Sequence, residues 1–352
     1  MLDQLLDDLA QAAEDRDSAR FFDVLPRLFA AAEGADRQTL SAVLARLSGL
    51  FERVPSGIGA RLGVLCGALA ERGADPAPVA EPLVNGLSDC LELAGTFAAA
   101  WRTATGEEPP KPVDDDYGWI PATAERLTGA ALTREQAIVL TDAWTLAHLW
   151  AMPVMSILQL SPQVRAALPG RERLIAALGS VLDERADLEF LAGLLRVLDG
   201  ERLIVLHRES GRGYEVLISG IGDNFQLHTL LAGALSGPAA DGLLEGVRPD
   251  PAWVRAAADG PVEPGAEPVR GQFNLVDANG KWIWNEGRPA DIPRLDGVRV
   301  VVLDPPPYAR TWSPGRMYPM MRGDVRLRRI LPQEEAAAWL AKVARGGIDR
   351  SG

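Results

Sequence analysis

The chain has 352 residues, of which 47% are hydrophobic and 24% charged, an ordinary composition for a globular protein of about two domains. The net charge of -12 disfavours a general nucleic-acid binder, because the field of the whole chain repels phosphate. The chain lacks an apolar run of the roughly 20 residues that span a bilayer, and its acidic start, Met1-Leu2-Asp3-Gln4, is unlike a signal peptide. We therefore expect a cytoplasmic protein without a membrane segment. Its abundant Ala, Arg, Gly and Pro suggest a bacterial source.

The chain before about residue 200 is predicted to be helical. Apolar residues recur there at helical spacing, and Gly, Pro and Asp interrupt the pattern at 34–36, 55–57 and 73–76. Two helices would form a unit of about 40 residues, the period of HEAT-like helical pairs. An irregular bundle is the alternative, because no residue-level repeat accompanies the period. The period alone identifies no family.

Further helices are predicted along this half, with one acidic, proline-rich loop between them. The loop at 107–116 contains Asp114, Asp115 and Asp116, which lack the alternating ligands of a calcium loop and are expected to be solvated. Cys66 and Cys90 fall within helical patterns and fit buried apolar positions better than a disulfide framework. The predicted helices cover residues 82–105, 133–150, 162–168 and 171–198.

After residue 200 the periodicity changes to that of short strands. Strands are predicted at 203–208 and 214–219, followed by a helix that Asp223 caps and that ends near Leu235. A second hairpin joins 272–277 to 281–285 through Ala278-Asn279-Gly280, and the β-branched run 298–303 predicts a strand buried on both faces. Short helices are expected at 251–258 and 333–343. The sequence thus predicts an α+β fold: a helical array over 1–199 and a mixed or antiparallel sheet module with flanking helices over 200–352.

The motifs of several familiar chemistries are missing. The three histidines, His148, His207 and His228, do not have the spacing of a helical metal site, and no Cys-x-x-Cys or His-Glu-x-x-His is present. Neither Gly-x-Ser-x-Gly nor a phosphate-binding loop occurs, and the segment around Gly220 and Gly222 departs from the dinucleotide-binding pattern. We therefore expect no metal and no cofactor.

Two segments remain as candidate sites. The first is the turn 219–228, where Asp223 and His228 are candidate acid/base groups; alternatively Asp223 only caps the helix and His228 packs against the sheet. The second joins a strand to a stiff, proline-rich loop whose aromatic and Arg side chains are typical of recognition surfaces, unless they only pack over their own sheet. Its candidate binding residues are Trp282, Trp284, Tyr308, Arg310, Trp312 and Arg316.

The basic residues are concentrated near the second candidate site. Residues 281–331 contain ten basic and five acidic residues, a net charge of +5, so the remainder of the chain carries -17. This basic tract could dock on the acidic helical half of the same chain, or it could form a site for an anion or an acidic peptide.

Three functions are compatible with these features. The favoured one is a non-enzymatic protein that presents the aromatic and Arg loop to a protein or peptide partner. The second is an enzyme of unfamiliar type that acts on an anionic small molecule or a peptide, with an acid/base group in the 219–228 turn and an Arg clamp in the 304–318 loop. The third is a subunit of a larger complex that docks through its acidic helical half.

Overall fold

The structure, a computed structural model, describes residues 1–112, 119–129, 132–246 and 248–344. The chain divides into two compact units, Met1–Leu195 and Arg196–Gly352, which we call the helical unit and the α+β unit. The α+β class predicted from the change in periodicity is confirmed. The predicted solvated loop at Asp114, Asp115 and Asp116 lies outside the described residues.

The helical unit consists of helices separated at the predicted breaks. Asp36, for example, accepts a hydrogen bond of 2.8 Å from the backbone N–H of Thr39 and so caps the third helix. The helices are α1 (Leu2–Glu14), α2 (Ser18–Ala31), α3 (Arg37–Ser48), the 3-10 helix η1 (Phe51–Arg53), α4 (Ser56–Glu71), α5 (Ala77–Thr105), α6 (Trp119–Leu127), α7 (Arg134–Leu160), α8 (Pro162–Ala166), α9 (Arg171–Gly179), the 3-10 helix η2 (Ala186–Leu188) and α10 (Glu189–Leu194).

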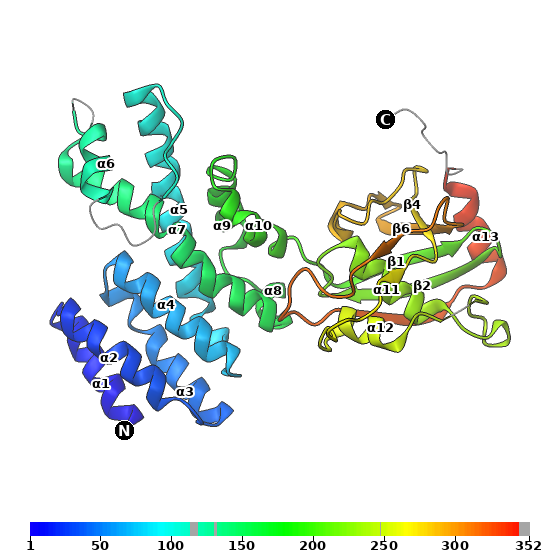
Figure 1. Ribbon diagram of the computed structural model, residues 1–352, viewed down its shortest axis with the longest axis horizontal. Coiled ribbons are helices and arrows are strands. Elements are labelled where there is room, and N and C mark those ends of the chain that lie inside the picture. Colours follow the sequence, from blue (N-terminus) through cyan, green and yellow to red (C-terminus); the bar gives the residue numbers. More distant parts are fainter. Residues whose placement is uncertain (113–118, 130–131, 247, 345–352) are drawn as a thin grey trace. The chain divides into compact units, whose positions relative to one another are not determined.

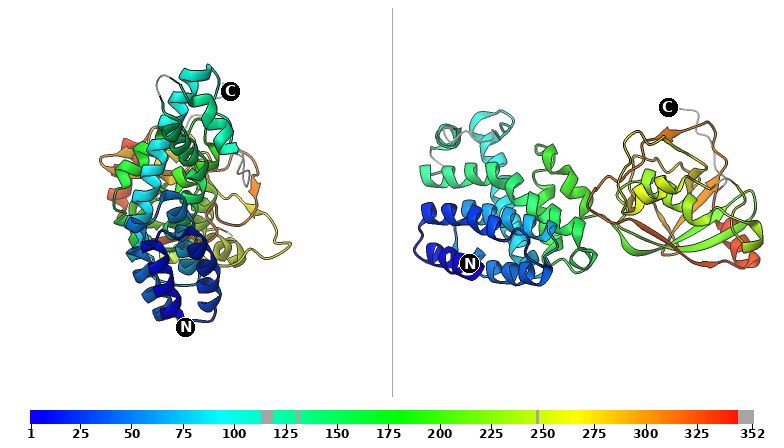
Figure 2. Two further views of the ribbon diagram at one scale, coloured as in Figure 1. Left: turned by 90° about the vertical axis from the view of Figure 1, so that its left-hand side faces the viewer. Right: turned by 60° about the horizontal axis from the view of Figure 1, so that its bottom comes forward.

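The long helices α5 and α7 run side by side and form the centre of the helical unit (Figures 1 and 2). The prediction that the second of them ends at Trp150 is wrong, because α7 continues past Pro153 to Leu160. Pro153 packs against Gly63 and Gly67 of α4, where a Cβ atom would lie 3.1 Å from Pro153. Two glycines thus make room for the proline.

Helix α7 is also the one helix in the described residues that is long and apolar enough to cross a bilayer by length and composition. More than half of its most apolar stretch is buried inside the helical unit, where α4 and α5 pack against it. Packing within the unit therefore accounts for the buried part of this apolar stretch.

The prediction of one continuous helix over 171–198 is also wrong. The chain leaves α9 at Gly179 and passes through η2 into the short α10. Arg185, at the break, is almost fully buried: its Nη1 donates to the carbonyl of Trp144, and its guanidinium pairs with Asp187 at 2.8 Å. The backbone bends so that this buried cation is both hydrogen-bonded and neutralised.

The α+β unit contains a mixed sheet in the order β4-β6-β1-β2-β8, with β5 paired to β6, and a small sheet of β3 and β7. Only β1 and β6 are parallel; the other pairs of the larger sheet are antiparallel. The strands are β1 (Asp199–His207), β2 (Arg212–Ser219), β3 (Val269–Arg270), β4 (Asn274–Asp277), β5 (Arg294–Leu295), β6 (Val298–Asp304), β7 (Thr311–Trp312) and β8 (Asp324–Ile330).

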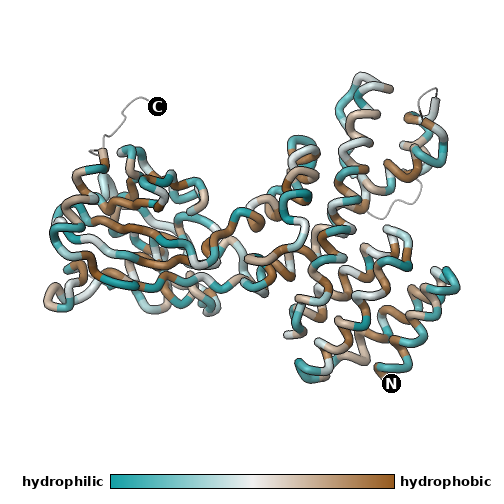
Figure 3. The backbone as a smooth tube through the Cα atoms, turned by 180° about the vertical axis from the view of Figure 1, so that it is seen from behind, coloured by the Kyte–Doolittle hydropathy of each residue, from teal (hydrophilic) through white to brown (hydrophobic). Residues whose placement is uncertain are grey.

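The larger sheet is covered on both faces, so the inner part of its central strand β1, residues 203–206, is apolar and buried on both sides. Figure 3 shows the hydrophobic stretches of the sheet in brown. Leu203 and Val205 of β1 point to the face covered by α11 (Asn224–Leu235) and α12 (Pro251–Ala258). Ile204 and Leu206 point to the opposite face, against α13 (Gln333–Lys342). This alternation follows from the pleat of a strand, which turns successive side chains to opposite faces.

Two details of the sheet differ from the sequence prediction. The second half of the second hairpin, predicted as a strand over 281–285, forms only a single bridge between Trp282 and Val276. The edge strand β8, in turn, was not predicted from the sequence. Both segments lie at the margins of the sheet. A strand in that position is paired on one side only, so its sequence pattern is weak.

Candidate functional site

Three aromatic side chains gather where the second hairpin meets the loop that follows β6. The ring centroid of Trp282 lies 5.8 Å from that of Trp284 and 6.4 Å from that of Tyr308. We call Trp282, Trp284 and Tyr308 the aromatic cluster. Trp284 is 62% exposed and Tyr308 53% exposed, so two of the three rings face solvent. The cluster thus unites three of the residues singled out in the sequence.

A depression of about 220 Å³ adjoins the aromatic cluster. It contains two opposite charges, the carboxylate of Glu286 and the guanidinium of Arg310. The buried amide of Asn285 stands at its wall, and its Oδ1 accepts no hydrogen bond within the described part of the chain. A buried acceptor without a donor is unusual in a folded protein and is commonly satisfied by water or a ligand. The lining residues are Phe225, Trp284, Asn285, Glu286, Tyr308, Arg310, Thr311 and Trp312.

Arg310 links the depression to the sheet. Its Nη2 donates hydrogen bonds of 3.1 Å to the carbonyl of Phe273 and to Oδ1 of Asn274, and its Cζ lies 5.7 Å from the ring centroid of Tyr308. These contacts fix the guanidinium in place at the rim of the depression. Arg310 therefore positions Tyr308 as well as supplying a charge.

Trp312 forms the inner wall of the depression. Its Nε1 donates to Oγ1 of Thr229 at 3.3 Å, and its ring lies 5.5 Å from that of Phe225 and 5.0 Å from that of His228. Trp312 therefore separates the depression from the interior of the unit.

His228 lies behind that wall and does not line the depression. It is 1% exposed, and its Nε2 accepts hydrogen bonds from the backbone N–H groups of Gln272 at 3.2 Å and Phe273 at 3.3 Å. This arrangement places the proton of the neutral ring on Nδ1. Burial, and secondarily the positive charge of Arg310, lowers the pKa of His228 to about 3. In this position the histidine is neutral and holds together the start of β4 and the side of α11.

Asp223 caps α11. Its carboxylate accepts the backbone N–H of Gln226 at 2.8 Å, and burial raises its pKa above the ordinary value despite that hydrogen bond. The first N–H groups of the helix donate to the carbonyls of Asn285 and Gly287. The turn at 219–228 thereby holds the segment that carries Trp284 in place. Phe225 is the residue of this turn that lines the depression.

Arg316 is not brought to this site. Its guanidinium donates to the carbonyls of Ala256 and Gly260 at 2.8 and 2.9 Å and to that of Pro319 at 2.8 Å. These hydrogen bonds of Arg316 connect the loop before β8 to the end of α12. Burial lowers its pKa, as expected for a guanidinium whose partners are uncharged carbonyls.

Most of the other basic residues in the tract 281–331 have acidic partners within the α+β unit. Arg299 lies 3.2 Å from Glu201, which also pairs with Arg294. Arg329 pairs with Glu215 and Glu335. The positive charge of this tract is therefore largely compensated within its own unit.

Larger cavities lie elsewhere among the described residues, and sequence reasoning missed the two that are described next. One, of about 810 Å³, is in the α+β unit between His207, Trp253, Arg270 and Phe273. The other, of about 740 Å³, is in the helical unit. Their walls come from segments far apart in the chain, so no local motif marks them. Among the described residues, no three His, Cys, Asp or Glu side chains gather in a way that could hold a metal ion.

Comparison of the chain with models of protein families, with curated proteins and with solved structures finds no match.

Proposed function

We propose that the α+β unit is a non-enzymatic binding module that recognises a protein or peptide partner through the aromatic cluster and the adjoining depression. The observation that carries this proposal is that Trp284 and Tyr308 are both exposed, both contact the ring of Trp282, and both line the same depression. Single exposed apolar side chains are ordinary on a protein surface, but adjacent ones mark interaction sites.

The surroundings of the two rings support recognition of a partner. Aromatic and Arg side chains provide most of the binding energy at many interfaces, because they bury a large area with little loss of conformational freedom. Arg310 and Trp312 are already held by hydrogen bonds, so these two side chains would lose little conformational entropy when a partner binds. Glu286 and Arg310 would select the charge pattern of the partner.

Catalysis by the predicted acid/base groups receives less support from the geometry. Neither Asp223 nor His228 lines the depression, and both are engaged in holding the backbone. An acid or base must come within hydrogen-bond reach of the proton that it transfers, and here Trp312 stands between His228 and the depression.

The test is a paired loss-of-binding experiment. The tagged wild-type chain is used to capture partners from extracts of its source organism, and the captured protein is identified by mass spectrometry and purified. Trp284→Ala combined with Tyr308→Ala should weaken its binding at least tenfold, because two aromatic anchors are removed.

The matched control is Val262→Ala combined with Ile330→Ala, which truncates two other exposed apolar residues of the same unit. It should bind within about twofold of the wild type, since surface truncations outside an interface are close to neutral. Equal binding by the aromatic variant and the wild type would refute the proposal. So would equal losses in the two variants.

A further inference from the structure

The net charge of the chain lies entirely in the helical unit. Residues 1–195 contain 28 acidic and 16 basic residues, which gives -12, whereas residues 196–352 contain 20 of each and are neutral. A strongly acidic unit attracts cationic partners, and a concave surface with the same sign of charge focuses that attraction.

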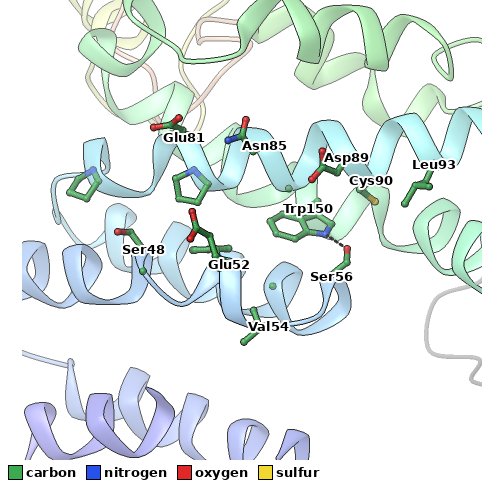
Figure 4. A pocket seen from close by; sticks show the side chains of 16 residues that line it. Ser48, Glu52, Val54, Ser56, Glu81, Asn85, Asp89, Cys90, Leu93 and Trp150 are labelled. Carbon is green, nitrogen blue, oxygen red and sulfur yellow. Dashed lines mark hydrogen bonds between the residues drawn. The ribbon is translucent and has the colours of Figure 1, made fainter. Parts of the chain in front are cut away.

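The 740 Å³ cleft of the helical unit is such a surface. It opens between the segment 48–59, which includes η1, and one side of α5 (Figure 4). Glu52 extends from η1 towards α5, while Glu81, Asn85 and Asp89 follow one another along α5 at intervals of four residues. That spacing places the three on one face of the helix. None of the described residues that line the cleft is basic.

The cleft is lined by three carboxylates, those of Glu52, Glu81 and Asp89. Asp89 pairs with Arg173 at 2.6 Å. Glu52 and Glu81 form no ion pair within the described residues, and both are exposed. The carboxylates of Glu52 and Glu81, both on the lining of the cleft, are therefore accessible to a cation of a partner.

The floor of the cleft is rigid and aromatic. Trp150 is buried there, and its Nε1 donates to Oγ of Ser56 at 3.1 Å. The ring fits against Gly59 and Gly86, where added Cβ atoms would lie 3.0 and 2.4 Å from it. The side chains of Phe51, Val54, Pro78, Pro82 and Leu93 supply apolar walls. The cleft therefore combines unpaired acids with an apolar lining.

We propose that this cleft binds a basic peptide segment of a protein partner. An Arg or Lys side chain would enter between Glu52 and Glu81, and the apolar neighbours of that side chain would lie on the proline and Phe51 wall. Recognition of such a peptide needs both the carboxylates and the apolar walls of the cleft. Carboxylates alone would bind any cation weakly, whereas the apolar walls favour a side chain with a hydrocarbon stem. This proposal is independent of the function proposed for the α+β unit.

The test uses fluorescence anisotropy with the full chain in 150 mM salt. The probe is a fluorescein-labelled peptide of four alternating Arg and Leu pairs, and its counterpart has Glu in place of each Arg. Only the Arg peptide should bind saturably, at one peptide per chain. Glu52→Gln combined with Glu81→Gln should weaken binding roughly tenfold, because the peptide loses two ion pairs with side chains at the exposed rim of the cleft. Asn85→Arg, which puts a cation into the cleft, should weaken it at least as much.

The control is Glu33→Gln combined with Glu108→Gln, two exposed acids of the same unit that lie outside the cleft. It removes the same charge and should change the affinity less than twofold. An equal loss in the two double variants would overturn the proposal, because it would show attraction to the unit as a whole. Binding of the Glu peptide, absence of saturable binding, or self-association of the chain that the cleft variants abolish would also overturn it.

Discussion

Replacing the buried histidine of the α+β unit tests the electrostatic description of its interior. His228 has a pKa of about 3 in the folded chain, against an ordinary value of 6.5, because burial disfavours the charged ring and Arg310 adds to the effect. Above pH 6.5 the ring is neutral in both the folded and the unfolded chain. Between pH 6.5 and pH 3 only the unfolded chain takes up the proton. The stabilisation is therefore complete above pH 6.5 and is lost as the pH falls.

The expected size follows from the displaced pKa. Each pH unit in that window should lower the free energy of unfolding by about 1.4 kcal/mol, which amounts to about 2 kcal/mol between pH 7 and pH 5. For a unit of this size the loss corresponds to a fall in melting temperature of roughly 4–8 °C. His228→Gln removes the titrating ring and should remove this part of the pH dependence, whatever its effect on stability at pH 7.

The assay is thermal unfolding of both proteins at pH 7 and pH 5. Burial also lowers the pKa of His207, but that residue is present in both proteins and cancels in the comparison. The chain has three histidines, so NMR titration can follow the ring of His228 directly. Parallel pH dependence of the two proteins, or a ring that titrates near pH 6.5 in the folded chain, would refute the reasoning.

Two further predictions concern the backbone and the thiols. Gly220 and Gly211 both have a left-handed φ, +63° and +68°, but a Cβ on Gly220 would lie 2.0 Å from the carbonyl oxygen of Arg322, whereas one on Gly211 meets open space. In urea unfolding, Gly211→Ala should cost about 1 kcal/mol and Gly220→Ala at least about 3 kcal/mol, and similar losses would contradict the described packing. Cys66 and Cys90 are buried and unpaired, and burial raises the pKa of both thiols, that of Cys90 to about 12. Neither should react with a thiol reagent at pH 8 until the helical unit unfolds, and rapid labelling of the native chain would show that the unit is more open than described.

The elements of the fold that the sequence predicts well are those with strong local signals. The helix at Asn224–Leu235 begins at a capping Asp and ends before Gly237-Pro238, and the strand at Val298–Asp304 is a run of β-branched residues. The helix past Pro153 could not be predicted in this way, because its continuation depends on glycines of another helix. Tertiary packing there outweighs the local preference of proline to end a helix.

The edge strand β8 illustrates a different difficulty. Its sequence, Asp324-Val325-Arg326-Leu327-Arg328-Arg329-Ile330, alternates between apolar and charged residues, as a strand with one solvated face would. A bulge at Arg328, which has no partner between the pairs Glu215–Arg329 and Val216–Leu327, breaks that period. The three arginines also make the segment read as a charged stretch and not as a strand. Charged side chains and a bulge are also the features that protect an edge strand from pairing with other chains.

The candidate site was predictable in composition but not in arrangement. The sequence identified Trp282, Trp284 and Tyr308, and the structure places these three together. It could not show that Arg316 binds backbone carbonyls, nor that Trp312 separates His228 from the depression. The acidic cleft had no sequence signal at all, because Glu52 and Glu81 belong to different helices and line one cleft only after folding.

The confinement of the net charge to the helical unit has a consequence for kinetics. Screening at physiological ionic strength reduces the reach of surface charge to about 8 Å, so dilution of the buffer should accelerate the encounter of that unit with positively charged molecules. The α+β unit has no net charge, and encounters at its surface should proceed at nearly the same rate in dilute and concentrated buffer. One chain would thus carry two surfaces whose association rates respond differently to the ions around them.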